Sequence, residues 1–176
     1  MDVQIKRLDA ACAAEAVGAL ADVLMDCVEG GASVSFMLPL AREKALTFWQ
    51  GVAAGVARGE RVLLVAETRE GEIVGTVQLI TAQPDNQPHR ADVAKMLVHR
   101  KARRQGIAQQ LMAAVDQTAQ AEGKTVLVLD TVTGGDAERL YARAGWQRVG
   151  VIPDYALKPD GAFCSTTYFY KHLPPR

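Results

Sequence analysis

The sequence predicts a mixed α/β fold, built on a mostly antiparallel sheet that contains two parallel central strands. The first observation is the order of the expected elements: strand, two helices, three strands, helix, strand, helix and two strands. The second is that apolar strands at 91–98 and 125–130 flank one helix, so they should be parallel neighbours joined by a right-handed crossover. The third is the length of 176 residues, 49% of them hydrophobic, which suits a single domain over 1–176 with its own core.

The first third of the chain predicts one strand and two helices. Val3, Ile5 and, less regularly, Leu8 mark the strand, and Asp9 can cap the helix that follows. Gly30–Gly31 ends that helix, and a second helix is expected from about 42 to 58. Apolar residues recur in both helices at spacings of three and four, which is typical of helices with one face in the core. They are Val17, Leu20, Leu24, Cys27 and Val28 in the first helix, and Ala45, Trp49, Val52 and Val56 in the second.

The middle of the chain predicts the centre of the sheet. Strands are expected at 61–67 and 73–80, joined by a turn at Glu70–Gly71. A polar loop at 81–89 separates them from the strand at 91–98. The helix that follows should run from about 105 to 121, because apolar residues recur there at helical spacing. They are Ile107, Leu111 and Val115.

The last third predicts three further strands around a short helix. The run at 126–129 is apolar on both faces, as in a buried strand, and ends at Asp130. Asp136 is expected to cap the short helix, and Gly145 to stop it. The final strands, at 146–152 and 164–170, should be joined by a long turn.

Composition excludes several classes of function. The formal net charge is zero, whereas nucleic-acid-binding proteins are usually strongly basic. No apolar run approaches the length of a membrane span, and the N-terminus has no apolar signal segment, so we expect a cytoplasmic protein without membrane or nucleic-acid partners. The three cysteines lack Cys-x-x-Cys spacing, which favours free thiols in a reducing compartment. The three histidines lack ligand spacing, so no metal is expected.

Four basic residues lie where a helix begins. Arg100, Lys101, Arg103 and Arg104 precede the helix at 105–121, and each cation at this positive end costs about 0.3–1 kcal/mol unless it is neutralised. A bound anion would neutralise them, and the free N–H groups of the first helical turn suit a phosphate or pyrophosphate. Gly106 has no Cβ, so a ligand can approach the backbone closely. A basic surface turn without a ligand is the alternative, and charge alone does not decide between them.

The spacing of this turn favours a coenzyme site. Arg103-x-x-Gly106-x-Ala108, between an apolar strand and an amphipathic helix, resembles the Arg/Gln-x-x-Gly-x-Gly/Ala signature of the GCN5-related N-acetyltransferases, the GNAT family. The resemblance implies acetyl-coenzyme A as cosubstrate, a sheet splayed between its two parallel strands, and helices on both faces. It also implies that the pantetheine arm bonds to strand backbone in the splay. The implied coenzyme-binding residues are Met96, Leu97, Val98, Arg103, Arg104, Gln105, Gly106, Ile107, Ala108 and Gln109.

A second motif concerns the reacting group. Residues 137–146, Ala-Glu-Arg-Leu-Tyr-Ala-Arg-Ala-Gly-Trp, resemble the family's Ala-x-x-Leu-Tyr-x-x-x-Gly-Phe segment. The resemblance implies that Tyr141 is a general acid, which faces the coenzyme sulfur and protonates the departing thiolate. Tyr141 also belongs to the apolar stripe of its helix, so packing alone is the alternative. Gly134 stands where many members have asparagine, so any role of that side chain in holding the coenzyme is absent or taken by water.

The acceptor amine must lose a proton before it can attack, since an alkylammonium has a pKa near ~10. Glu67, Asp92 and Asp130 lie near the expected centre of the sheet, and each by itself is more often structural than catalytic. Asp130 is the first choice for catalysis, because it ends a central strand near the helix of Tyr141.

A further resemblance indicates the acceptor. The segments 30–37, 129–131 and 159–161 are similar to those of the tabtoxin-resistance acetyltransferases, a group within this family that inactivates an amino-acid toxin containing a β-lactam. The resemblance implies a small amino-acid-like acceptor. Its carboxylate would be bound by a backbone N–H near Gly30–Gly31 or by a basic side chain that the sequence does not identify. The expected substrate-binding residues are Ser33, Val34, Phe36 and Asp92.

Three functions therefore stay open at this point. The first is a small-molecule N-acetyltransferase, acting as a monomer or homodimer. The second is an acetyltransferase for proteins or peptides, which would need an open groove. The apolar segment at 33–37 and the turn at 153–163 favour a closed one. The third is a non-catalytic acyl-coenzyme A binding module, against which the presence of Tyr141 argues.

Overall fold

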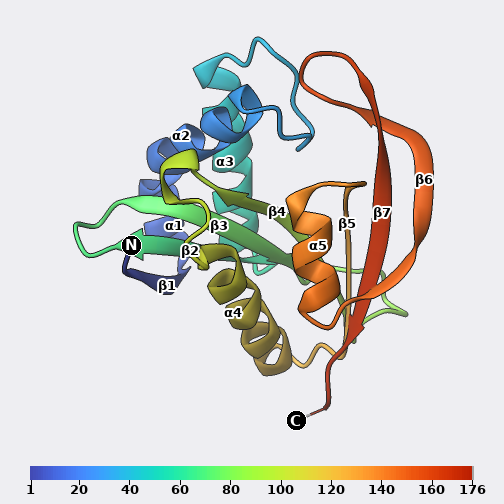
Figure 1. Ribbon diagram of the computed structural model, residues 1–176. Coiled ribbons are helices and arrows are strands. Elements are labelled where there is room, and N and C mark those ends of the chain that lie inside the picture. Colours follow the sequence, from blue (N-terminus) through green and yellow to red (C-terminus); the bar gives the residue numbers. More distant parts are fainter. Residues whose placement is uncertain (176) are drawn as a thin grey trace.

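A seven-stranded mixed sheet with helices on both faces forms the protein, as described by a computed structural model for residues 1–175 (Figure 1). The strand order is β1-β2-β3-β4-β5-β7-β6. The strands are β1 (Val3–Leu8), β2 (Arg61–Thr68), β3 (Ile73–Ile80), β4 (Arg90–Val98), β5 (Val126–Val132), β6 (Gln147–Leu157) and β7 (Phe163–His172). The helices are α1 (Ala10–Glu15), α2 (Val17–Glu29), α3 (Arg42–Ala57), α4 (Ile107–Ala121) and α5 (Asp136–Arg143), with a 3₁₀ turn at Arg100–Ala102.

The centre of the sheet confirms the predicted parallel pair. Strands β4 and β5 are parallel neighbours, joined through α4, and the other strand pairs are antiparallel. Their pairing is short, because only residues 90–92 of β4 face residues 126–128 of β5. Beyond these residues the two strands diverge, and β5 continues beside β7 (Figure 1). The sheet is therefore splayed at its centre.

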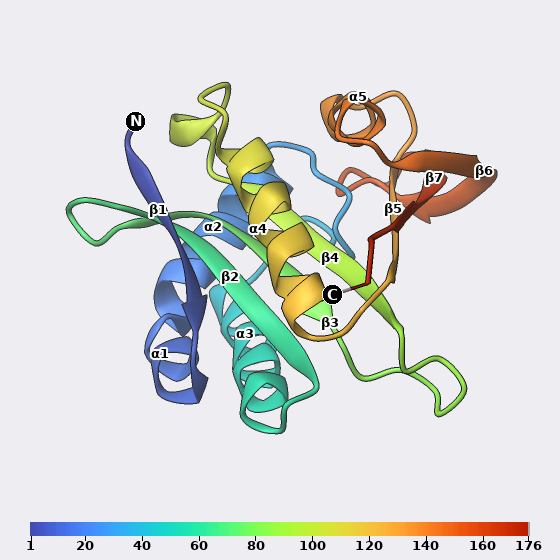
Figure 2. The same cartoon turned by 90° about the horizontal axis from the view of Figure 1, so that it is seen from below.

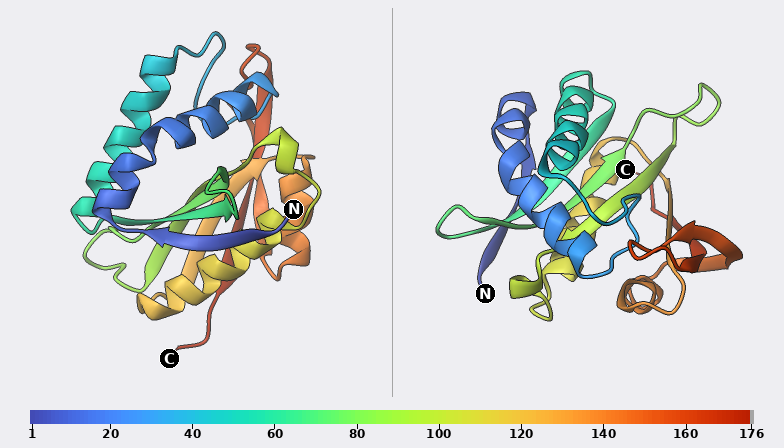
Figure 3. Two further views of the ribbon diagram at one scale, coloured as in Figure 1. Left: turned by 90° about the vertical axis from the view of Figure 1, so that its left-hand side faces the viewer. Right: turned by 90° about the horizontal axis from the view of Figure 1, so that it is seen from above.

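Two apolar cores lie on opposite faces of the sheet. Helices α1, α2 and α3 cover one face, and α4 and α5 cover the other (Figure 2). Strand β2 shows the alternation: Leu63 and Val65 face the α1–α3 core, whereas Val62, Leu64 and Ala66 face the α4 core. Figure 3 shows the sheet between these layers. Within residues 1–175, none of the helices has both the length and the apolar character needed to cross a membrane.

Several predicted boundaries are confirmed. The Asp9 carboxylate accepts a hydrogen bond from the Cys12 N–H at 2.8 Å and caps α1 as expected. Gly71 has a φ of 84°, in the left-handed region, at the turn between β2 and β3. Helix α4 starts two residues later than predicted, at Ile107. Gly106 has a left-handed backbone conformation, so it cannot be part of the α-helix.

Other boundaries differ from the prediction. The first helix is two, α1 and α2, which meet at Ala16, although no glycine or proline marks the boundary. Strand β5 does not end at Asp130, because its ladder with β7 continues to Val132. Strands β6 and β7 are also longer than expected, which leaves only residues 158–162 as the turn between them. Asp136 is not the cap of α5: it is the first helical residue, and Gly135 takes the cap position.

Candidate active site

The splay between β4 and β5 opens into a cleft of about 1400 Å³. Residues of β4, β5, α5, the start of α4 and the α2–α3 linker contribute to its walls. Pockets for one small ligand usually measure roughly 300–1,000 Å³, so this cleft has room for two reactants. A smaller cavity of about 340 Å³ lies between β1, α3 and β2, beside Arg7 and Glu122, and shares none of these walls.

The start of α4 forms one end of the cleft. Gly106 precedes the helix with a φ of 76°, and no side chain caps the helix. A Cβ built at Gly106 would meet nothing within 4 Å, so the space beside this turn is open. The N–H groups of Ile107, Ala108 and Gln109 belong to the first turn, where an α-helix has no internal acceptors for them. This end therefore suits a phosphate or pyrophosphate group.

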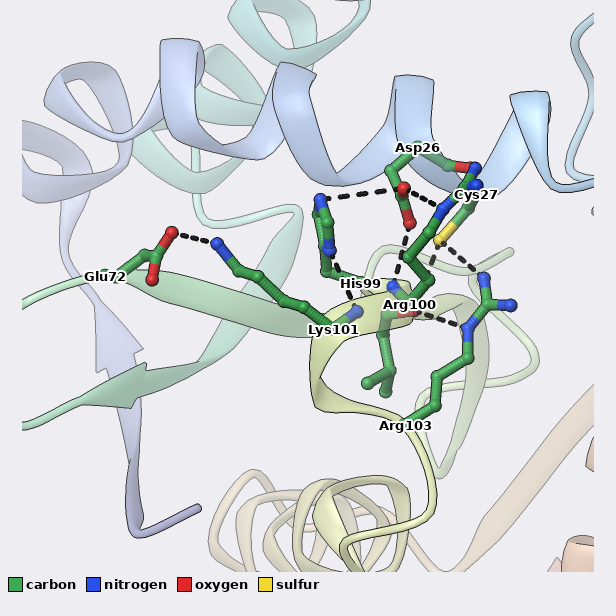
Figure 4. A network of polar contacts seen from close by, with 8 residues as sticks. Asp26, Cys27, Glu72, His99, Arg100, Lys101 and Arg103 are labelled. Carbon is green, nitrogen blue, oxygen red and sulfur yellow. Dashed lines mark hydrogen bonds and ion pairs between the residues drawn. The ribbon is translucent and has the colours of Figure 1, made fainter.

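The basic turn before α4 is partly neutralised within the protein (Figure 4). The Asp26 carboxylate, on α2, accepts hydrogen bonds from the backbone N–H and the guanidinium of Arg100. Lys101 forms an ion pair with Glu72. Two of the four cations thus have acidic partners, which corrects the inference that a bound anion must neutralise all four. Arg103 and Arg104 are the pair that lines the cleft.

The same network fastens the basic turn to α2. Burial raises the pKa of Asp26, but hydrogen bonds from Arg100 and the charges of His99 and Arg100 outweigh burial, so the pKa lies below its usual value. The Arg103 Nε donates to the Val98 carbonyl at 3.1 Å, and Figure 4 shows its guanidinium beside Cys27. Burial also raises the pKa of the Cys27 thiol, although Arg103 opposes the shift. Cys27 is thereby kept as a protonated, packed side chain.

The predicted pantetheine wall is the unpaired edge of β4. Residues 93, 94, 97 and 98 pair with β3, and 95 and 96 form a bulge between them. None of these residues has a ladder with β5, so their backbone on the β5 side faces the cleft. Met96, Leu97 and Val98 all line it. The Leu97 side chain packs into the α1–α3 core, so its contribution to the cleft wall comes mainly from backbone.

Tyr141 lies across the cleft from β4, on α5. Its ring packs against Trp146 and Phe169, with centroid distances of 6.1 and 6.0 Å, and its side chain also lines the cleft. Burial raises the pKa of Tyr141 to about 12. The phenol therefore keeps its proton throughout the neutral range.

Asp130 lies on β5 with its side chain on the sheet face opposite Leu129. The residue is exposed and lines the cleft. Its carboxylate accepts a hydrogen bond of 2.7 Å from the Thr166 hydroxyl on β7, which holds its orientation. Asp130 is thus available to a cationic group in the cleft.

Lys95 also lines the cleft, and the sequence prediction missed it. It lies at a bulge in β4, where the register with β3 shifts, and its φ of 53° is left-handed. Its Nζ donates to the Ser35 hydroxyl at 3.0 Å and lies 5.9 Å from the centre of the Phe48 ring. The sequence signal was a lone lysine within the apolar strand at 91–98.

The expected acceptor residues divide into two groups. Ser33 and Val34 line the cleft, and the Ser33 hydroxyl donates to the Leu157 carbonyl at 3.1 Å. Phe36 does not line it; its ring packs edge-on against Phe48 in the α1–α3 core, because the linker turns that residue inward. Asp92 does not line it either, since its carboxylate is bonded to Arg90 and Gln83.

Two other predicted residues also lie elsewhere. Gln105 is not part of the cleft wall, and its side chain accepts a hydrogen bond from the N-terminal amine. Glu67, weighed as a possible base, is paired with Lys6 at 2.5 Å. Within residues 1–175, no group of three or more His, Cys, Asp or Glu side chains is arranged to hold a metal ion.

Comparison with known sequences finds matches to acetyltransferases. The sequence model of the family described as "Acetyltransferase (GNAT) domain" matches residues 59–148, the stretch from β2 to the start of β6. A relative from Azospirillum brasilense, "Uncharacterized N-acetyltransferase in hisH-hisA intergenic region", is 34% identical over 131 residues. These residues are 73% of this chain and 75% of the relative.

Solved structures share the fold at low sequence identity. The N-acetyltransferase from Staphylococcus aureus Mu50 is 18% identical, with a TM-score of 0.80 over 99% of this chain and 100% of that chain. The protein yncA from Salmonella typhimurium, solved with its cofactor acetyl-CoA, is 17% identical, with a TM-score of 0.78 over 100% of this chain and 96% of that chain. The likeness extends over nearly the whole of each chain.

Proposed function

The chain belongs to the GNAT family of N-acetyltransferases, and we propose that it transfers an acetyl group from acetyl-coenzyme A to the amine of a small amino-acid-like molecule. When bound, the coenzyme supplies an acetyl group activated as a thioester. The unpaired β4 edge and the turn at Gly106 fit its pantetheine arm and pyrophosphate. Arg103 and Arg104 would add positive charge beside the phosphates.

The observation that carries the acceptor class is the contact of the α2–α3 linker, which lines the cleft, with the β6–β7 segment. The α2–α3 linker lies beside the β6–β7 turn (Figure 1), and the Leu38 N–H donates to the Pro159 carbonyl at 3.1 Å. The Ser33 hydroxyl adds a second bond, from the linker to the Leu157 carbonyl at the end of β6. These two bonds hold the linker against β6 and the turn that follows it, which supports a bounded site for a small acceptor.

Asp130 and Tyr141, which both line the cleft, are the proposed catalytic residues. Asp130 would attract the acceptor ammonium and take its proton, directly or through water. Tyr141, with a pKa of about 12, would hold its proton at the hydroxyl and donate a hydrogen bond to the departing sulfur. A thiol has a pKa of about 8.5, so a proton shared in this bond is favoured over complete transfer from the phenol.

The test is a thiol-release assay with acetyl-coenzyme A. The acceptors are free amino acids, including a β-lactam-containing toxin analogue, together with polyamines and lysine-containing peptides. Free amino acids should be acetylated fastest. Faster acetylation of a peptide would replace this proposal with a protein acetyltransferase, and coenzyme binding without release for any acceptor would replace it with a binding module.

A further inference from the structure

Lys95 has the features of a ligand-binding cation and few of those of a structural one. It is half-buried in the cleft wall, and its backbone is held in a left-handed conformation that costs a non-glycine residue roughly 1–2 kcal/mol. Such strain persists only where the surrounding structure enforces it, and it is concentrated at functional sites. The bulge at 94–96 enforces it here and directs the side chain toward the α2–α3 linker.

The ammonium of Lys95 has no bonded countercharge. It forms no ion pair with Asp130 or with any other carboxylate that the structure describes. Its neighbours are a neutral hydroxyl, on Ser35, and the face of Phe48. These two contacts orient the group and leave donors of the ammonium for a ligand.

Burial makes this arrangement costly. Burial lowers the pKa of Lys95. The negative charge of Asp130 raises this pKa, and the positive charge of Arg61 lowers it further. A partly buried cation without an anionic partner is destabilising, and a bound anion would remove that cost. Asp130 also lines the cleft, and its charge acts on Lys95, so the site offers a cation and an anion that are not bonded to each other.

We propose that Lys95 binds the carboxylate of an α-amino-acid acceptor whose ammonium group faces Asp130. A zwitterion placed between them satisfies both charges at once, whereas a simple amine or an amide satisfies only Asp130. The inference rests on the proposed function and names the substrate class of the same site. Lys95 is thus the basic side chain for the acceptor carboxylate that the sequence alone did not identify.

The test compares free L-amino acids with their primary amides in the thiol-release assay. The wild-type protein should prefer the acid, and Lys95→Met should lower kcat/KM for the acid by about ten- to a hundred-fold, the value of one charged hydrogen bond. The loss should appear mainly in KM, and the amide should be unaffected. Lys95→Arg should retain most of the preference, because it restores the charge.

Two controls separate recognition from folding. Lys44→Met removes an exposed lysine of α3 that lies outside the cleft, and should leave the preference intact. Acetyl-coenzyme A should raise the melting temperature of Lys95→Met as much as that of the wild type, which would show that the fold and the coenzyme end are preserved.

The outcomes distinguish this inference from the proposed function. Equal losses for acid and amide in Lys95→Met would overturn the carboxylate assignment while acetyltransfer stands. If no amino acid leads to thiol release, calorimetry measures the binding of each amino acid and of its amide in the presence of coenzyme A. If the wild-type protein binds the acid more tightly than the amide and Lys95→Met does not, the carboxylate site is kept and the proposed function is overturned. If the wild-type protein does not distinguish any amino acid from its amide, in either turnover or binding, the proposed role of Lys95 is overturned.

Discussion

The two ends of the cleft are built in different ways. The proposed coenzyme end comes from one continuous segment, 96–109, in which a left-handed glycine precedes a helix, and its expected contacts are mainly backbone. The proposed acceptor end consists of side chains from separate elements: Lys95 of β4, Asp130 of β5, Ser35 of the linker and Tyr141 of α5. A backbone site tolerates many side chains, so it can stay constant across a family. A side-chain site changes with single substitutions, so it is where acceptor specificity resides.

The largest effect is expected at the acceptor end, from a substitution of Tyr141. Tyr141→Phe keeps the packed ring and removes only the hydroxyl, so turnover should fall by roughly ten- to a thousand-fold while coenzyme affinity hardly changes. Tyr170→Phe is the matched control, because it deletes a hydroxyl outside the cleft. Steady-state kinetics measures both variants, and wild-type turnover in Tyr141→Phe would show that another group serves the departing thiol.

A smaller loss is expected at Asp130. Asp130→Asn keeps the bond from Thr166 and removes the charge, so kcat/KM for the acceptor should fall by about ten- to a hundred-fold. Coenzyme binding, followed by thermal shift, should be unchanged, since that end is built separately. An equal weakening of coenzyme binding would break the division of the cleft into two independent ends.

The coenzyme end is tested at the two glycines that flank α4. Gly106 and Gly123 have φ values of 76° and 74°, and a Cβ at either would meet nothing within 4 Å. Both alanine variants should therefore lose a similar stability, about 1 kcal/mol, from the strained backbone. Only Gly106→Ala should weaken acetyl-coenzyme A binding, by about ten-fold in Kd measured by calorimetry. Equal affinity of the two variants would exclude the turn at Gly106 as the pyrophosphate site.

The smallest effect concerns the network that fastens the coenzyme end to α2. Asp26→Asn should lower the free energy of unfolding by roughly 1–3 kcal/mol at neutral pH, because it disrupts hydrogen bonds from Arg100 to a carboxylate side chain that is only 11% exposed. The folded pKa of Asp26 is depressed, so its contribution is complete above the unfolded value of about 3.9 and is lost as pH falls through the folded value. The difference between wild type and variant should therefore shrink below about pH 4, as denaturant unfolding can measure.

Asp22→Asn provides the comparison, one turn earlier on the same helix. Asp22 pairs with Arg42, but its side chain is 63% exposed, so the loss should be only about 0–1 kcal/mol. Similar losses for the two variants would mean that the Asp26 network adds nothing beyond a surface ion pair.

Local patterns in the sequence predicted most of the strands and helices, and they predict a coenzyme site at the start of α4. The strand, the basic turn and α4 are contiguous, so the apolar periodicity and the basic, small-residue start of the helix could be recognised from local spacing. The left-handed conformation of Gly106, which sets the helix start at Ile107, was not predicted. The parallel pair followed from the same local order, because one helix between two apolar strands leaves few ways to connect them.

Ion pairs and contacts between distant parts of the chain are visible only in the tertiary structure. Asp26 and Glu72 neutralise Arg100 and Lys101 from 74 and 29 residues away in the sequence, so their pairing has no local signal. The register shift in β4 directs Lys95 toward Ser35, 60 residues away, beside Asp130 in the cleft. A shift of one residue reverses the face to which a strand side chain points, and sheet packing rather than residue type sets that shift.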